Sequence, residues 1–151
     1  LKDLTKLNSI ELSFNLIEDV SHMKELKQLK AVWLSGNRIQ DVNAFKDLKE
    51  LDQLYLDSNQ IRDISPLAEL KNLRVLFLDK NQVSDLSALK ELKNMHDLSL
   101  ANLQIKDLSP LKGLKQMGTL NIYNNHEITK AQIDELQKAL PNCRIDHNAQ
   151  K

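Results

Sequence analysis

The sequence predicts an α/β solenoid, a right-handed arc of short stacked turns with a parallel sheet along its concave side. Three observations predict this fold. Asparagines recur at intervals of 22 residues or multiples of 22. Apolar residues recur with the same period, and the central ones of each unit alternate with polar residues, as in a strand. Residues 126–151 break the period and carry a helical pattern.

The asparagine column marks the end of each predicted strand. Its members are Asn15, Asn37, Asn59, Asn81 and Asn125, and Leu103 stands where a further asparagine would fall. A side-chain amide both donates and accepts, so it can satisfy backbone groups where the chain leaves the sheet. We interpret the column as a structural hydrogen-bond fixture rather than a catalytic feature. At Leu103 we expect a local distortion, or a gap filled by packing.

The apolar columns indicate how the units stack. One column runs Ile10, Val32, Leu54, Leu76, Leu98, Leu120, and another runs Leu12, Leu34, Leu56, Leu78, Leu100, Ile122. A single unit cannot bury its apolar face, but neighbouring units can share one continuous core. A turn of 22 residues allows a parallel crossover and leaves no room for a long helix. We therefore expect short 3₁₀ or extended return segments.

The full unit reads L-x-x-L-x-x-L-x-L-x-x-N-x-I-x-D-[IVL]-S-x-L. It resembles a leucine-rich repeat of the 22-residue class, found in bacterial internalins and in SDS22-like proteins. The segments DISPL (63–67) and DLSPL (107–111) look especially internalin-like. The resemblance implies a leucine-rich repeat region of about six units over 1–125, with the asparagines forming a ladder. It implies little about function, because one fold serves many partners.

An aspartate column follows the asparagines and is usually followed two residues later by serine. Its members are Asp19, Asp41, Asp63, Asp85 and Asp107. Aspartate and serine at turn starts bond nearby backbone amides, which is the role we expect here. A calcium site is not expected, because the spacing lacks the clustered carboxylates of a Ca²⁺ loop.

The C-terminal segment, 126–151, is predicted to be a cap. Thr129 and Gln132 form a capping-box pattern, and we expect a helix over about 130–140 that stops at Pro141. Cys143 and Ile145 then suit a last, seventh strand with Arg144 pointing outward. Terminal repeats must cover the exposed end of the core.

No such cap is recognisable at the N-terminus. The apolar residues there are Leu1, Leu4, Leu7, Ile10 and Leu12. We expect an upstream cap or further repeats to be missing, so that the chain is a fragment of a longer protein. An exposed apolar end would favour end-to-end self-association through the first repeat.

Composition excludes several classes of function. The 21 basic and 21 acidic residues balance, which argues against nucleic acid as a partner. No apolar run approaches the ~20 residues that membrane insertion needs. The four histidines and the single cysteine, Cys143, show no metal-ligand spacing, and no catalytic serine motif occurs. We expect a non-enzymatic protein without metal or cofactor, in which Cys143 is a small hydrophobic residue of the cap.

The outward side of the strands, here called the strand face, is expected to be the concave wall of the arc. Its central column runs Glu11, Trp33, Tyr55, Phe77, Ser99, Asn121, Arg144. Three of the six aromatic residues, including the only tryptophan, thus occupy consecutive places turned away from the core. They could simply stabilise the sheet as cross-strand pairs. Alternatively, they form a recognition stripe, because exposed aromatics contribute strongly to binding.

Two flanking columns complete the strand face. One runs Ser9, Ala31, Gln53, Val75, Asp97, Thr119, and the other runs Ser13, Ser35, Asp57, Asp79, Ala101, Tyr123. Acids therefore border the stripe: Glu11, Asp57, Asp79 and Asp97. We expect a protein or peptide partner that carries apolar anchors beside lysine or arginine. Trp33, Tyr55 and Phe77 would form the centre of this site, with the four acids and Tyr123 around them.

Other functions stay open at this point. The chain could be a structural spacer or assembly repeat of a larger bacterial protein, or an SDS22-like regulatory subunit that binds a phosphatase. Carbohydrate recognition by the aromatic stripe is a further alternative. An internalin-like protein would be secreted or displayed at the cell surface, whereas an SDS22-like one would be cytoplasmic.

Overall fold

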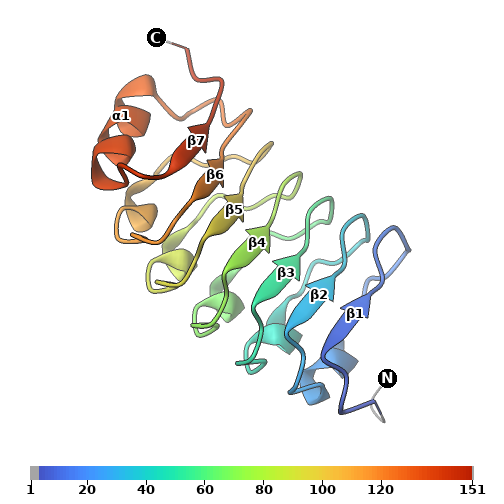
Figure 1. Ribbon diagram of the computed structural model, residues 1–151. Coiled ribbons are helices and arrows are strands. Elements are labelled where there is room, and N and C mark those ends of the chain that lie inside the picture. Colours follow the sequence, from blue (N-terminus) through green and yellow to red (C-terminus); the bar gives the residue numbers. More distant parts are fainter. Residues whose placement is uncertain (1–3, 151) are drawn as a thin grey trace.

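The computed structural model describes residues 4–150 (Figure 1). Within that range, seven short strands lie side by side in one open sheet, in chain order and all parallel. This confirms the predicted solenoid with a parallel sheet. The strands are β1 (Ser9–Glu11), β2 (Ala31–Trp33), β3 (Gln53–Tyr55), β4 (Val75–Phe77), β5 (Asp97–Ser99), β6 (Thr119–Asn121) and β7 (Arg144–Asp146).

Short 3₁₀ turns return the chain from one strand to the next, on the side away from the sheet (Figure 1). They confirm the expectation of short return segments. The turns are η1 (Ser21–Glu25), η2 (Asn43–Phe45), η3 (Ser65–Leu67), η4 (Ser87–Leu89) and η5 (Ser109–Leu111). Between sheet and turns lies one apolar core, in which Leu54, Leu56 and Phe45 are fully buried.

The asparagine column forms the predicted ladder. The side-chain nitrogen of Asn59 donates to the carbonyl oxygens of Leu34 and Leu56, both at 3.0 Å. Its side-chain oxygen accepts from the backbone N–H of Ile39 at 3.0 Å. One amide thereby ties two consecutive rungs together. The same pattern recurs, with all side chains buried, at Asn37, Asn81 and Asn125.

The ladder gap at Leu103 shows both expected effects. The leucine is buried in the core, so packing fills the place of the missing amide. The backbone contact beside it is stretched: the N–H of Gln104 lies 3.5 Å from the carbonyl oxygen of Val83, against 2.8 Å for Gln82 and Ile61 one rung earlier. A leucine can thus replace the side-chain packing of an asparagine but not its hydrogen bonds.

A second periodic feature of the backbone was not predicted. The residue just before each asparagine position has a left-handed backbone, with φ between 54° and 68°, in Phe14, Gly36, Ser58, Lys80, Asn102 and Asn124. Glycine and asparagine suit such turns better than serine, phenylalanine or lysine. A Cβ atom on Gly36 would lie 2.6 Å from a ring carbon of Phe14, so Gly36 also leaves room for that ring.

The aspartate column caps the turns as predicted. In each of the five repeats the Oδ1 atom accepts, at 2.8 Å, the backbone N–H of the residue two positions on. For Asp63, Asp85 and Asp107 this N–H is the main cause that lowers the carboxyl pKa, and for Asp19 the Ser21 hydroxyl is. These carboxylates therefore stabilise the backbone of the turns.

The C-terminal cap consists of helix α1 (Lys130–Ala139) and strand β7. Thr129 and Gln132 form the predicted capping box, and Ile133 and Leu136 are buried against the last repeat. The proposed division between repeats (1–125) and cap (126–151) falls in the loop between β6 and α1. Helical spacing also predicts Ala131 on the apolar side of this helix, with Ile133, Leu136 and Leu140, but Ala131 is exposed.

One prediction about the cap is wrong. Arg144 was placed in the central column of the strand face, but the register pairs Arg144 with Thr119 and Asp146 with Asn121. Ile145, not Cys143, therefore takes the inward place beside Leu120. The helix lengthens this last unit to 25 residues between Asn121 and Asp146, which is three more than the repeat period and two more than the predicted pairing with Arg144 required. An acid thus ends the central column instead of a base.

At the N-terminal end, Leu1 lies outside the described residues. Ile10 is buried, Leu7 and Leu12 are half-buried, and Leu4 is 50% exposed. Phe14 and Leu16, which the sequence analysis did not single out, are 82% and 71% exposed. The first repeat thus carries most of the large apolar side chains that the described part of the chain exposes.

Candidate functional site

The three aromatic residues of the central column lie on the strand face as predicted. The register aligns Trp33 with Tyr55 and Tyr55 with Phe77 on consecutive strands. All three are half-buried, whereas Leu54, next to Tyr55 in β3, is fully buried. This difference follows from strand alternation, which turns successive side chains to opposite faces.

The rings contact one another across the strands. Trp33 and Tyr55 stack with centroids 5.8 Å apart and planes 17° apart. Tyr55 and Phe77 meet at 4.9 Å with a tilt of 59°. These are favourable aromatic geometries, and they make one continuous aromatic strip over β2, β3 and β4, here called the aromatic stripe (Trp33, Tyr55 and Phe77).

Beyond Phe77 the central column becomes small and polar. Ser99 is buried, and its hydroxyl donates to Asp79 Oδ1 at 2.7 Å and accepts from the side-chain nitrogen of Asn121 at 3.1 Å. Asp79 Oδ1 also accepts the backbone N–H of Ala101 at 3.0 Å. This network fixes the surface beside the aromatic stripe, and sequence columns alone did not reveal it.

The predicted acids all lie at the strand face, in different settings. Asp57 accepts from the Ser35 hydroxyl at 2.6 Å. Asp97 lies 3.3 Å from the imidazole of His96. Glu11 is exposed, and hydrogen bonds from Ser13, chiefly its hydroxyl and then its N–H, lower the pKa of this carboxyl. Tyr123, at the end of the flanking column, is 47% exposed and stands apart from the stripe by strand order.

Bases at the strand starts were missed. Lys30, Arg74 and His96 occupy one column, just before their strands, and are exposed. Arg74 lies 3.8 Å from Asp52 of the same column. These bases could have been found from the 22-residue spacing, because it places them in one column next to the flanking column that contains Asp97. The strand face is therefore acidic around the aromatic stripe. Along the edge where the strands begin, it carries both acidic and basic side chains.

The strand face also has a hollow that extends from β3 to β7. Its lining includes the rings of Tyr55 and Phe77, Asp97 and Thr119 of the flanking column, and Asp146 on β7. Ser99 and Asn121 of the central column also line it. The hollow connects the aromatic stripe to the acid that the corrected register brings into the central column.

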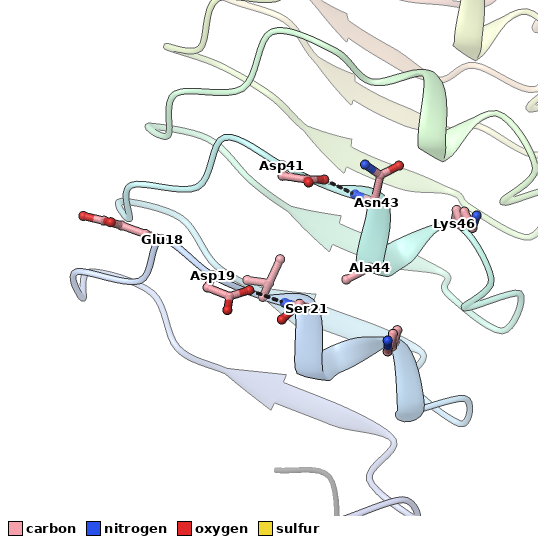
Figure 2. A pocket seen from close by; sticks show the side chains of 9 residues that line it. Glu18, Asp19, Ser21, Asp41, Asn43, Ala44 and Lys46 are labelled. Atoms are coloured by element: carbon pink, nitrogen blue, oxygen red, sulfur yellow. Dashed lines mark hydrogen bonds between the residues drawn. The ribbon is translucent and has the colours of Figure 1, made fainter.

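A cleft on the return side, between η1 and η2, offers less chemistry. Figure 2 shows that its two aspartates turn back onto the chain, Asp19 to the N–H of Ser21 and Asp41 to the N–H of Asn43. Lys24 and Lys46 also border it. These two carboxylates hold the turns in place. They therefore have a structural role and do not indicate a ligand-binding site.

Residues 4–150 contain no group of three or more histidine, cysteine or acidic side chains that could hold a metal ion. Burial, and then the nearby Asp146, raise the pKa of the Cys143 thiol to about 11, so the reactive thiolate is disfavoured. None of the helices described is long and apolar enough to cross a bilayer.

Comparison with known families places this architecture. The family model described as "Leucine Rich repeats (2 copies)" matches residues 27–69, 49–91 and 71–113, which together exceed half of the chain. The chain therefore belongs to the leucine-rich repeat family. A search of curated protein sequences gave no significant match.

Solved structures refine this class. An internalin (inlF) from Listeria monocytogenes superposes with a TM-score of 0.93 at 31% identity, over 99% of this chain and 45% of that one. Internalin C2 of the same species gives 0.77 at 28% identity, over 99% and 76%. A leucine-rich repeat protein of Leptospira interrogans gives 0.86 at 26% identity, over 96% and 38%. The chain is an internalin-like leucine-rich repeat protein, and it spans less than half the length of the inlF structure.

Proposed function

We propose that this chain is a non-catalytic module that binds a protein or peptide through its strand face. The observation that carries the proposal is the aromatic stripe, an aligned run of three half-exposed rings. Cross-strand pairs of this kind stabilise a sheet by about 0.2–1 kcal/mol each. Tryptophan and tyrosine are in addition enriched among the residues that dominate binding energy at protein interfaces.

The charges beside the stripe support a partner of defined chemistry. Asp57 and Asp79 follow Tyr55 and Phe77 by two residues, and Asp97 lies on the strand next to that of Phe77. Asp146 lies in the central column at β7. Carboxylates favour partner lysine or arginine and raise the rate of encounter with basic surfaces. The partner we propose therefore presents apolar groups to the rings and basic groups to the acids.

The proposal excludes catalysis and nucleic acid as main roles. The turn aspartates are engaged by backbone N–H groups, and the one thiol is held protonated. The balanced net charge offers no basic field for a phosphate backbone. Self-association through the first repeat is a separate proposal that rests on exposed Leu4, Phe14 and Leu16, and analytical ultracentrifugation over a concentration series tests it.

A comparison of three baits tests the binding surface. The purified chain, a Trp33→Ala/Tyr55→Ala variant and a control with Lys71→Ala/Lys93→Ala on the return side are immobilised side by side. We expect the same partner on the chain and the control, and its loss from the aromatic variant. If the aromatic variant is folded and retains every partner, the strand face is not the site, and a spacer role is favoured instead.

A further inference from the structure

We propose that the hollow over β3 to β7 binds one basic side chain of the partner, an arginine or a lysine. The proposal rests on the proposed binding function and names the chemistry of one subsite. It is carried by the shape of the hollow, by its aromatic wall and by the balance of charge around it.

The hollow arises from a step in the central column. Going from β4 to β5, the side chain changes from the ring of Phe77 to the small hydroxymethyl group of Ser99. Phe77 packs on Tyr55 at one side, but at the other it meets only the short serine within this column. Because Ser99 is held down by Asp79 and Asn121, the step is fixed rather than filled by a mobile side chain.

The wall of the hollow suits a cation. Tyr55 and Phe77 both line it. The face of an aromatic ring attracts a guanidinium or ammonium group within about 6 Å of its centroid, arginine more often than lysine. The aliphatic part of a long basic side chain can lie along the rings while its charged end reaches the polar side.

Carboxylates in the lining supply the countercharge. Asp97 and Asp146 line the hollow, and Asp79 accepts the hydrogen bond from the hydroxyl of Ser99, which also lines it. Asp97 contacts His96 at 3.3 Å and Asp146 contacts Arg144 at 3.0 Å, each through one carboxylate oxygen. The side chain of Arg144 is 77% exposed. Asp97 and Asp146 thus each have a second oxygen outside these ion pairs, and a further cation can contact it because the two side chains are 42% and 35% exposed.

The position of the hollow also defines a spacing in the partner. Asp97 is on β5 and Trp33 is on β2, three strands away. Strands lie about 4.8 Å apart, so the two sites are separated by about 14 Å across the sheet. An extended peptide advances about 3.3 Å per residue and would place its basic residue about four positions from its apolar anchor.

A small probe tests the hollow directly. N-acetyl-L-arginine amide is titrated into the ¹⁵N-labelled chain, with the uncharged N-acetyl-L-citrulline amide as matched ligand. We expect arginine to shift the amide signals of Asp97, Ser99, Thr119 and Asp146, and citrulline to bind at least tenfold more weakly. Addition of 0.5 M NaCl should weaken the arginine interaction, because part of it is electrostatic.

Variants make the test specific. Asp97→Asn/Asp146→Asn should weaken arginine binding at least tenfold, whereas Glu69→Gln/Glu91→Gln, which removes the same charge on the return side, should leave it unchanged. The proposal is overturned if arginine shifts no signal at the hollow, if citrulline binds equally well, or if the aspartate variant binds as the wild type does. Such a failure would leave the proposed binding through the aromatic stripe untouched, because the three-bait comparison measures capture of the natural partner and includes Trp33, which does not line the hollow.

Discussion

The indole of Trp33 lies nearly parallel to the phenol ring of Tyr55 on the next strand, with 5.8 Å between centroids and 17° between planes. The pair lies on the exposed side of the sheet, over a core formed by the inward residues of the same strands. A stacked pair of this kind contributes about 0.5–1.5 kcal/mol beyond the burial of its surface. Its effect on stability can therefore be separated from its effect on binding.

Replacement of Trp33 should change stability only modestly. We expect Trp33→Ala to lower the free energy of unfolding by about 1 kcal/mol, because the ring is half-exposed and loses mainly its contact with Tyr55. Leu56→Ala, in the fully buried column, should lower it by about 2–5 kcal/mol. Urea unfolding followed by circular dichroism measures both. A loss at Trp33 as large as that at Leu56 would mean that the stripe is mainly structural.

The ladder predicts a sharp contrast between two asparagines. Asn59→Ala removes three hydrogen bonds that join buried backbone groups of two rungs, so we expect a loss of about 3 kcal/mol. Asn15→Ala removes two contacts at an exposed position of the first repeat and should cost less than about 1 kcal/mol. Measured free energies of unfolding of the two variants test this contrast. Equal losses of stability would contradict a ladder role for Asn59.

Acid should destabilise the fold through the turn aspartates. Hydrogen bonds from serine lower the folded-state pKa of Asp19, Asp63, Asp85 and Asp107 below the value of about 3.9 in an unfolded chain. Their contribution is therefore fully present above about pH 5 and is lost as the pH falls through the folded-state pKa.

The corresponding asparagine variants test this dependence. Asparagine keeps an acceptor oxygen for the serine N–H but does not titrate. A chain with all four aspartates changed to asparagine should show a smaller fall in melting temperature between pH 7 and pH 3 than the wild type. An unchanged fall would show that other groups control acid unfolding.

The thiol of Cys143 should be unreactive in the folded chain. Burial raises its pKa to about 11, so little thiolate exists at pH 8. We expect iodoacetamide to modify Cys143 much more slowly in buffer than in 6 M guanidinium chloride, as measured by mass spectrometry. Rapid modification of the native chain would mean that the cap opens readily or that the thiol is accessible.

The repeat period was sufficient to predict most of the fold. The columns around Leu54 and Leu56 recur so regularly that parallel stacking, strand positions and the ladder at Asn59 follow from one physical requirement, a shared core. The helix at 130–139 was likewise predicted, because Thr129 and Gln132 give a local signal that does not depend on distant contacts.

The prediction failed where the period is interrupted. Arg144 and Asp146 both point away from the core side of β7 by alternation, and the unit lengths before the helix could not show which of them pairs with Asn121. The step from Phe77 to Ser99 was visible in the sequence, but its meaning depends on the hydrogen bond between Ser99 and Asp79. Ser99 is the only serine in its column, so this contact has no counterpart in the other repeats and gives no periodic signal.

The left-handed column was missed for a similar reason. Gly36 and Asn102 suit a positive φ, but Phe14 and Lys80 do not, so residue type gave no common signal. The turn before each ladder position imposes the positive φ, whatever type of side chain stands there. Tertiary structure thus overrides local preference at Phe14 and leaves an exposed ring next to Gly36.

The single tryptophan allows the most direct test of the binding surface. The chain is produced with 5-fluorotryptophan, which gives one ¹⁹F resonance at Trp33, and is titrated with a partner recovered from the three-bait comparison. We predict that the resonance moves or broadens in proportion to the fraction bound, with an affinity that matches calorimetry. A resonance that stays unchanged when the partner is saturating would contradict the assignment of the aromatic stripe as the docking site.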